Sequence, residues 1–522
     1  MNPACRHQPA VASPHHAATR AGADVLAAGG NAVDAAVATN AMLAVVYPHM
    51  CGLGGDLFLL YHSAADRRVR CLNGSGPAPR LATRDAFRER GLTAIPPRGP
   101  LPVTVPGAVG AWQEALERFG RRPLSELLAP AAQAAHEGVE VSAGLAASLQ
   151  DNRDELAADP LLRERFLDGT GRPLAVGATL HQPEVAGTLR RLIDHGARDF
   201  YGGVIAERID AACRTADGFL RRDDLAGYAP RWVEPLRVPY RGLEVVTPPP
   251  NSQGITALMM LNILTVLDAS RHPPGSADHI EALIAAKHVA FAARDRYVTD
   301  PDFLEAPVKR LLSLDHARQA LSAPPGPVRS SGGDTVYICT ADGEGNACSL
   351  IQSLFYGFGS GFVAGESGVL LQNRGHYFSL EDDHPNRLEP GKRTLHTLMA
   401  CMALDGDALR LVFGTMGADG QAQTNVQVLE RLLAGDSPQE AVAAPRILHG
   451  RFHPDDDPTV LSVEERLAPE TIEQLAARGH DPRVLPAYDE SFGHAHAIEL
   501  RPDGTTRAGS DPRSDGSAIV LE

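Results

Sequence analysis

Lysine is nearly absent from this chain of 522 residues, which contains only Lys287, Lys309 and Lys392. An enzyme that forms a Schiff base, with pyridoxal phosphate or with a carbonyl substrate, would have to use one of these amines. None of them lies in a recognisable motif. The sequence therefore argues against covalent catalysis by lysine.

Cysteine is also scarce, since the chain has seven cysteines that are scattered and form no C-x-x-C pair. That pattern favours neither a disulfide framework nor a zinc site. His376, His384 and His396 lack the spacing of a helical metal motif. His494 and His496 could share one face of a strand, which permits a metal without requiring one. We expect no metal and no cofactor.

Long apolar runs are missing as well. No stretch reaches the roughly 18 apolar residues that a membrane-spanning helix requires, and residues 1–19 contain no apolar signal core. The net charge of −15 argues against nucleic acid or an anionic membrane surface as a partner. With 43% hydrophobic and 22% charged residues the composition is that of a globular protein, which we expect to be cytoplasmic.

The second half of the chain contains a clear sequence pattern for a β-hairpin. A Pro/Gly/Ser-rich run over 321–333 ends abruptly, and an apolar, partly β-branched segment follows at 336–340. Gly, Asp and Asn at 342–346 predict a turn, and a second strand is predicted at 347–355. Thr335 therefore lies at the start of the first strand of a hairpin.

Thr335 permits two interpretations. Threonine is a good strand former, and a structural role is the ordinary reading of one that opens a strand. If the chain were cut before it, however, Thr335 would carry a hydroxyl and a free α-amine. An α-amine has a pKa of about 7.7–8.0 and can accept the hydroxyl proton near neutral pH. Cleavage between Asp334 and Thr335 would thus create a nucleophile with its own base.

Other segments predict a layered protein. Helical patterns occur at 17–27, 32–46, 279–298 and 423–433, and most of 124–264 reads as helical. Strands are expected at 57–62, 369–371 and 409–413. Strands in both halves, with helices around them, are typical of a helix–sheet–sheet–helix architecture.

Several motifs resemble the γ-glutamyltransferase family, whose members are N-terminal-nucleophile hydrolases that cut themselves before a threonine. The motifs are Asp334-Thr335, Asp342-x-x-Gly345-Asn346-Ala347, Phe358-Gly359-Ser360-Gly361, the run from Ala364 to Leu371, and G-x-G-G-D at 52–56. The resemblance implies a four-layer αββα sandwich. It also implies autoprocessing into a large subunit, 1–334, and a small subunit, 335–522, which stay together as one globular heterodimer, alone or paired with a second.

The resemblance also implies the catalytic residues. Thr335 would be the nucleophile, and Ser353 stands where the family has a threonine that contacts it. The backbone N–H groups of Gly417 and Ala418 match a Gly-Gly pair that stabilises the oxyanion. A satisfied strand serine and a plain turn are the structural alternatives for Ser353 and for this loop.

The substrate pocket departs from the family transferases. The arginine of their R-E-x-A-P motif is replaced by Ser75, and their serine pair by His396 and Thr397. Their ammonium-binding Asn, Gln and Asp correspond to Phe355, Arg374 and Tyr377. Arg374 suits a substrate carboxylate through two parallel hydrogen bonds, although a salt bridge within the protein is an alternative.

The local pattern around Arg374, His396 and Gly417 most resembles the oxamate amidohydrolase branch of the family. We therefore expect a self-processing amidohydrolase that acts on a small anionic amide such as oxamate and needs no cofactor. Three alternatives stay open: a γ-glutamyltransferase or glutathione hydrolase proper, a relative that hydrolyses a C–C bond to release oxalate, and an unprocessed binding protein.

Overall fold

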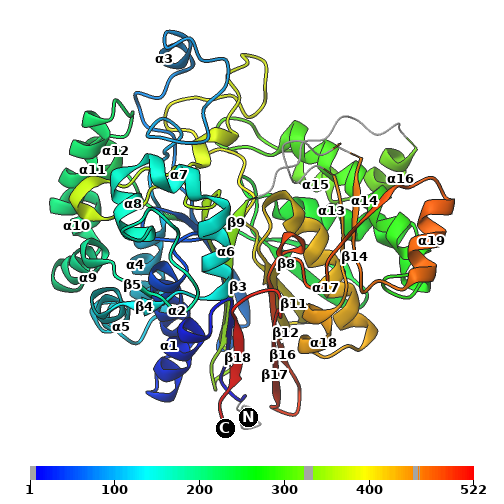
Figure 1. The fold of residues 1–522 in the computed structure, drawn as a ribbon. Helices are drawn as coiled ribbons and strands as arrows, with labels where there is room; N and C mark the ends of the chain where they lie inside the picture. The colour runs from blue at the N-terminus through cyan, green and yellow to red at the C-terminus, as the bar shows by residue number, and fades with distance from the viewer. Residues whose placement is uncertain (1–6, 323–332, 451–456, 458) are drawn as a thin grey trace.

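Two antiparallel sheets stacked face to face form the centre of the molecule, and helices cover both outer faces (Figure 1). The computed structural model describes residues 7–322, 333–450, 457 and 459–522. Most of the polar run that precedes Thr335 therefore lies outside the described residues. Four layers, in the order helix–sheet–sheet–helix, confirm the predicted αββα architecture.

Each sheet contains strands from both halves of the chain. The first sheet has the order β18 (Ser517–Val520), β1 (Ala10–Ser13), β9 (Asp334–Ala341), β10 (Ala347–Phe355), β2 (Asp56–Ser63), β3 (Arg68–Gly74) and β6 (Arg231–Val233). The second has the order β17 (Thr506–Ser510), β16 (Ala495–Leu500), β12 (Ala408–Thr415), β11 (Cys401–Asp405), β8 (Leu243–Thr247) and β7 (Leu236–Tyr240). The halves 1–334 and 335–522 thus build one common core.

The side chains of β9 alternate between two cores, as the period of a strand requires. Val336 and Ile338 pack against the outer helices, whereas Tyr337 and Cys339 lie in the apolar layer between the sheets. Gly414 of β12 faces the Tyr337 ring so closely that a Cβ there would lie 2.2 Å from a ring carbon. By the same alternation, Thr335 points between the two sheets at the end of β9.

Each outer layer contains one helix that is apolar on every side. In the first layer, α2 (Ala32–Val46) is buried at every residue, and Asn31 and Asp34 cap its start reciprocally. The helices α1 (His16–Ala27), α4 (Ala108–Phe119), α5 (Leu124–Glu137) and α9 (Pro183–His195) complete this layer (Figure 1). In the second layer, α13 (Gly254–Val266) is the buried helix, beside α14 (Ala277–Tyr297) and α17 (Gln421–Ala434).

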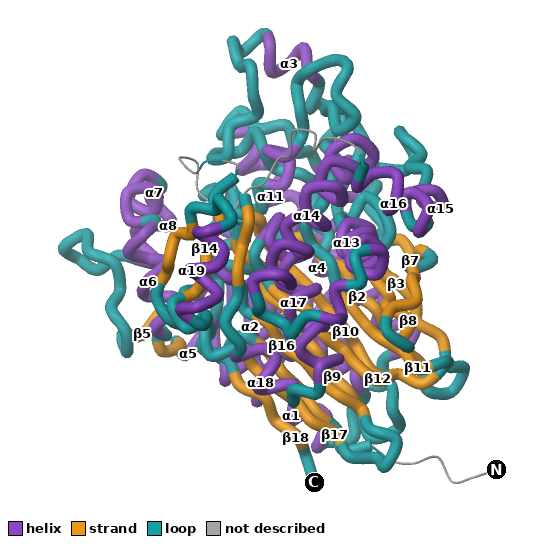
Figure 2. The backbone as a smooth tube through the Cα atoms, turned by 90° about the vertical axis from the view of Figure 1, so that its right-hand side faces the viewer, coloured by secondary structure: helices purple, strands orange, loops and turns teal. Residues whose placement is uncertain are grey.

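Smaller elements lie at the periphery. Figure 2 shows α19 (Pro469–Ala477) and β14 (Leu461–Glu464) away from the central strands. The strand β14 pairs with β13 (Ile447–His449) and β15 (Pro482–Leu485) in a separate sheet. In the described part of the chain, no helix is long and apolar enough to cross a membrane.

Most of 124–264 is helical, as predicted, but the secondary structure differs from the prediction in two places. The segment 124–264 contains strands β6, β7 and β8 besides its helices, and Tyr240 ends β7 before the turn into β8. Val369–Leu371 forms only isolated bridges, from Leu370 to Val363 and from Leu371 to Gly54. In both places short apolar runs were ambiguous, and tertiary packing decided between helix, strand and loop.

Candidate active site

Thr335 lies opposite a β-bulge. In the β9–β10 pair, Val336 faces Gln352 and Asp334 faces Phe355, so that Ser353 and Leu354 together oppose Thr335 alone. Phe355 has a left-handed backbone, with φ of 86°, which is unusual for an aromatic residue. Bulges of this kind re-aim side chains next to active sites, and this one turns Ser353 toward the neighbouring peptide bond.

Two hydroxyl groups converge on the carbonyl oxygen of Asp334, the residue before Thr335. Thr335 Oγ1 donates to this oxygen at 2.7 Å, and Ser353 Oγ donates to it at 2.6 Å. The Phe355 N–H donates in turn to Ser353 Oγ at 2.7 Å. Burial and the negative charge of Glu490 raise the pKa of the Asp334 carboxyl to about 7. The Asp334–Thr335 peptide bond is thus held in a buried, well-defined position.

The Gly417–Ala418 loop follows β12 and runs into a 3-10 turn and α17. Both residues have left-handed φ angles, of 119° and 42°, which glycine adopts easily and alanine does not. Their N–H groups donate to no partner among the described residues. A Cβ placed on Gly333 would lie 3.2 Å from the Ala418 side chain, so the loop borders the segment that leads into Thr335.

A buried ion pair braces this loop. Arg294 of α14 donates to Asp419 at 2.5 Å and to the Gln253 side-chain oxygen at 3.1 Å. The Gln253 amide group donates to the Ala418 carbonyl at 2.8 Å. The predicted pocket residue Tyr377 also donates to Asp419, at 2.7 Å. Sequence reasoning missed Arg294 and Gln253, because neither stands in a motif that points to the loop.

Arg374 is fully buried and forms no ion pair with a carboxylate in the described part of the chain. It donates to Thr397 Oγ1 at 2.9 Å and to Ser353 Oγ at 3.4 Å, and its guanidinium lies 4.2 Å from the centre of the Phe355 ring. Its Nε has no hydrogen-bond partner among the residues that the structure describes. Burial lowers the pKa of Arg374 to about 10, so the group stays charged at neutral pH. The alternative interpretation, a salt bridge between Arg374 and a protein carboxylate, is therefore not observed among the described residues.

His396 is paired with Asp56, the last residue of the G-x-G-G-D motif. Its Nε2 lies 3.0 Å from Asp56 Oδ2, and its Nδ1 accepts the Leu398 N–H at 3.3 Å, so the proton is on Nε2. Burial lowers the pKa of His396 well below its usual range and raises that of Asp56 to about 7. Both ring nitrogens of His396 already have hydrogen-bond partners, so His396 affects the pocket by holding Asp56 in place.

Ser75 lies in a neighbouring polar cluster. Its hydroxyl donates to Asn73 at 2.6 Å and accepts from Asn251 at 3.2 Å. The next N–H, that of Gly76, donates to Asp56 at 3.0 Å. The structure therefore brings Thr335, Ser353, Arg374 and Thr397 into one chain of contacts, and the Ser75 side chain bonds instead to Asn73 and Asn251.

In the part of the chain that the structure describes, no group of three or more His, Cys, Asp or Glu side chains could hold an ion. His494 and His496 are buried, and burial lowers the pKa of these imidazoles to about 4 and about 3.

Comparison with known proteins decides the family. Residues 18–521 match the family model described as Gamma-glutamyltranspeptidase. This chain belongs to the gamma-glutamyltranspeptidase family. It is 40% identical to the Glutathione hydrolase-like YwrD proenzyme of Bacillus subtilis and 37% identical to the Oxamate amidohydrolase proenzyme of Klebsiella pneumoniae, each over 98% of both chains. The structure of cephalosporin acylase from Bacillus halodurans superposes with a TM-score of 0.91 and 36% identity, over 99% of this chain and 96% of that one.

Membership of the gamma-glutamyltranspeptidase family confirms the fold class and the enzyme class that the sequence predicted. The αββα sandwich is the N-terminal-nucleophile type, and the chain is an amidohydrolase of this family. The roles of individual site residues stay predictions.

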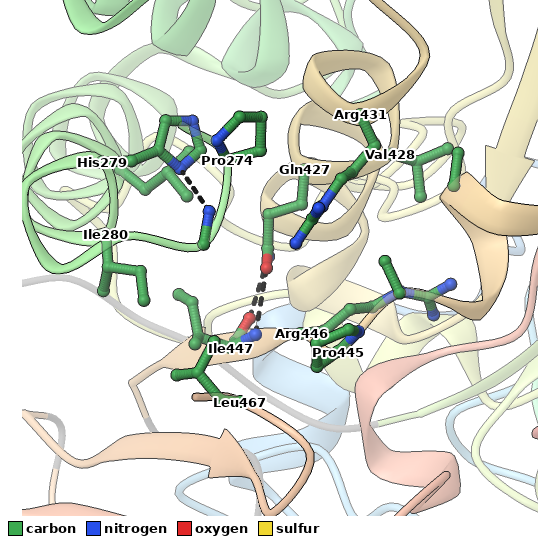
Figure 3. Close-up of a pocket in the computed structure, with 14 residues that line it drawn as sticks. Pro274, His279, Ile280, Gln427, Val428, Arg431, Pro445, Arg446, Ile447 and Leu467 are labelled. Carbon is green, nitrogen blue, oxygen red and sulfur yellow. Dashed lines mark hydrogen bonds between the residues drawn. The ribbon is translucent and has the colours of Figure 1, made fainter. Parts of the chain in front are cut away.

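A surface pocket in the second helix layer is separate from this site (Figure 3). His279 of α14, Gln427 and Arg431 of α17, and Ile447 of β13 lie around it. Gln427 closes one side through two hydrogen bonds with the Ile447 backbone, at 2.9 and 3.0 Å. None of the predicted site residues lines this pocket.

Proposed function

We propose that this chain is a self-processing amidohydrolase that hydrolyses a small anionic amide through an acyl-enzyme on Thr335. The observation that carries the proposal is the peptide bond before Thr335. Its carbonyl oxygen accepts hydrogen bonds from the hydroxyls of Thr335 and Ser353, in a buried bulge at the end of β9. Relatives that are 37–40% identical over 98% of this chain are named as proenzymes.

Cleavage at this bond would yield residues 1–334 and 335–522. The new strand end at Thr335 lies in β9, which is hydrogen-bonded to β1 of the first chain on one side and to β10 on the other. The strand β10 pairs with β2 of the first chain. Because both sheets contain strands from both chains, we expect a heterodimer that does not separate without unfolding.

In the processed enzyme, the α-amine of Thr335 accepts the hydroxyl proton while the oxygen attacks the substrate carbonyl. The negative charge that develops on the carbonyl oxygen is stabilised by the N–H groups of Gly417 and Ala418, which have no partner among the described residues. The leaving amine takes the proton, and a water molecule then hydrolyses the ester on Thr335. These steps need only groups of this chain and water.

Arg374 supports an anionic acyl group. It is a buried guanidinium without a carboxylate partner among the described residues, and leaving such a charge unpaired costs several kcal/mol. A substrate carboxylate would supply the missing charge and could use the free Nε.

The position of Arg374 also limits the length of the acyl group. Its Nη2 is 3.4 Å from Ser353 Oγ, which is itself 2.6 Å from the carbonyl oxygen of Asp334. A substrate whose carbonyl carbon lies within reach of Thr335 Oγ1 and whose carboxylate reaches Arg374 therefore needs only a short acyl chain. An oxalyl group satisfies this condition, in keeping with the name of the Klebsiella relative.

A glutathione hydrolase is the second candidate, favoured by the name of the Bacillus relative. A γ-glutamyl group carries an ammonium, which needs a carboxylate that no other cation occupies. Asp419 is the carboxylate beside Tyr377, and it is already bonded to Arg294 at 2.5 Å. The pocket therefore supports an anion better than a zwitterion.

Two measurements test the proposed function. Intact mass and N-terminal sequencing of purified protein should identify two chains, the smaller beginning Thr-Val-Tyr-Ile. The processed enzyme should then be assayed on oxamate, a glutaryl amide and γ-glutamyl anilide, with turnover of oxamate expected. A full-length protein without turnover of any amide would contradict the proposal and favour a binding protein.

A further inference from the structure

The carbonyl oxygen of Asp334 has an environment that only the uncleaved chain can have. It accepts the Ser353 hydroxyl at 2.6 Å in addition to the Thr335 hydroxyl at 2.7 Å. In self-cleavage, this oxygen gains negative charge when Thr335 Oγ1 adds to the carbonyl carbon. A donor that already points at it lowers the energy of that state.

The loop proposed for substrate turnover does not serve this oxygen in the uncleaved chain. Neither the Gly417 N–H nor the Ala418 N–H donates to Asp334, or to any other partner in the described ranges. Self-cleavage and substrate turnover therefore use different hydrogen-bond donors for the oxygen of the carbonyl that Thr335 attacks. The scissile carbonyl points toward β10, whereas the free N–H groups lie at the end of β12.

The Ser353 hydroxyl has only one way to orient its proton. A hydroxyl has one donor and two acceptor positions. The Phe355 N–H at 2.7 Å and Arg374 Nη2 at 3.4 Å occupy the acceptor side. The single proton of Ser353 is therefore directed at Asp334, and the positive charge of Arg374 strengthens it as a donor.

We propose that Ser353 is the oxyanion donor for cleavage of the Asp334–Thr335 bond, a role separate from any contact with the nucleophile during substrate turnover. This inference rests on the proposed self-cleavage. Thr335 Oγ1 forms a bond to the Asp334 carbonyl carbon, and the π electron pair moves to the oxygen that Ser353 holds. The C–N bond then breaks, the nitrogen takes the hydroxyl proton, and an ester with a free α-amine results. Water hydrolyses the ester to the Asp334 carboxylate and the Thr335 hydroxyl.

The test is the cleavage rate of freshly synthesised full-length chain, followed by gel electrophoresis and intact mass. Ser353→Ala should slow cleavage by at least about 100-fold, the usual effect of removing one oxyanion donor. Ser353→Thr keeps the hydroxyl and should stay within about tenfold of the wild type. Ser349→Ala is the matched control, because Ser349 is a buried hydroxyl on the same strand that contacts Tyr337 instead. It should cleave at the wild-type rate.

The outcomes separate this inference from the proposed function. A folded Ser353→Ala chain that cleaves as fast as the wild type would overturn the role of Ser353 and leave self-cleavage standing. Ser353→Thr as slow as Ser353→Ala would also overturn it, because the hydroxyl would then not be the group that matters. A wild-type chain that never cleaves before Thr335 would overturn both. Circular dichroism and melting temperature of each uncleaved chain establish that the variants are folded.

Discussion

The nucleophile end of the site and the acyl pocket are built in different ways. At the nucleophile end, Thr335, Ser353 and the Gly417–Ala418 loop contribute hydroxyl and backbone groups from the ends of adjacent strands. In the acyl pocket, charged side chains contact partners from other segments of the chain, Arg374 with Thr397 and Asp419 with Arg294. The first region depends on backbone geometry, whereas the second depends on which side chains neutralise one another.

This difference suggests how one fold can change substrate without losing its chemistry. Backbone donors survive substitution, as Ala418 illustrates by keeping its N–H in a left-handed position. The charged groups of the pocket differ in whether a group of opposite charge is in contact with them. Asp419 is paired with Arg294 and Asp56 with His396, while Arg374 forms no hydrogen bond or ion pair with a carboxylate among the described residues. We therefore expect substitutions in the two regions to have separable effects.

The largest expected effect is at the nucleophile. Thr335→Ala removes the attacking oxygen, so the protein should remain a single chain of 55.5 kDa with no amidase activity. Thr335→Ser keeps a hydroxyl and should still be cleaved, more slowly. Intact mass spectrometry checks both variants. A Thr335→Ala protein that still yields two chains would show that the cut does not depend on this residue.

The next effect concerns stability. Arg294→Ala leaves the buried Asp419 carboxylate without its partner, which should reduce the free energy of unfolding by about 3–5 kcal/mol. Denaturation of the uncleaved Thr335→Ala background avoids any difference in processing. The matched control is Arg231→Ala, which breaks an ion pair on the surface and should leave the melting temperature within about 2 °C. Equal effects of the two substitutions would contradict the bracing role of Arg294.

The third expected effect is the dependence of the melting temperature on pH. Burial lowers the pKa of His49, His494 and His496 to about 3, 4 and 3, whereas an unfolded imidazole has about 6.5. Below pH 6.5 the unfolded chain binds protons that the folded chain does not, so the melting temperature should fall as pH drops from 6.5 to 4. The raised pKa values of Asp56 and Asp334 act in the opposite direction over pH 4–7, because the folded chain binds these two protons more tightly.

Thermal unfolding at pH 8, 6.5 and 5 measures this balance. We expect little change between pH 8 and 6.5 and a clear loss at pH 5. His496→Gln should reduce the dependence on pH. A melting temperature that rises toward pH 5 would contradict the assignment of these imidazoles as neutral in the folded state.

The smallest effect is expected at the edge of the pocket. Tyr377→Phe removes one hydrogen bond to Asp419 and leaves the ion pair with Arg294. The activation free energy should therefore rise by about 1 kcal/mol, which lowers kcat/KM roughly fivefold. Tyr240→Phe removes an equivalent buried bond, to Glu430, far from Thr335. This control should leave kcat/KM unchanged. A loss of equal size in both variants would mean that Tyr377 acts only through overall stability.

The two regions also differ in how far the sequence predicted them. Thr335, Ser353 and Gly417 stand in local motifs next to strands whose periodicity is clear, and β10 has the predicted bounds of Ala347–Phe355. The order of layers followed from the alternation of apolar patterns. The strands β7 and β8 were missed because their apolar runs are short and flanked by helices.

The partners in the pocket could not be predicted. Arg374, His396 and Tyr377 were singled out as substitutions relative to the family, but their contacts join segments that are 21 to 340 residues apart. Asp56 lies 340 positions from His396, and its G-x-G-G-D motif does not indicate which side chain it contacts. Arg294 is one of several arginines on a helix, and nothing in its local sequence indicates which carboxylate it meets. Such pairs follow from the packing of whole layers.

The most direct test of the account compares two amides that differ in one group. Oxamate and oxamide share the reacting carbonyl, but only oxamate carries a carboxylate. The wild-type enzyme should prefer oxamate by at least about 100-fold in kcat/KM. Arg374→Ala should lose about 2–5 kcal/mol on oxamate alone, and Arg374→Lys should recover part of it. Efficient turnover of γ-glutamyl anilide by the wild type, with oxamate untouched, would contradict the account and restore the glutathione hydrolase assignment.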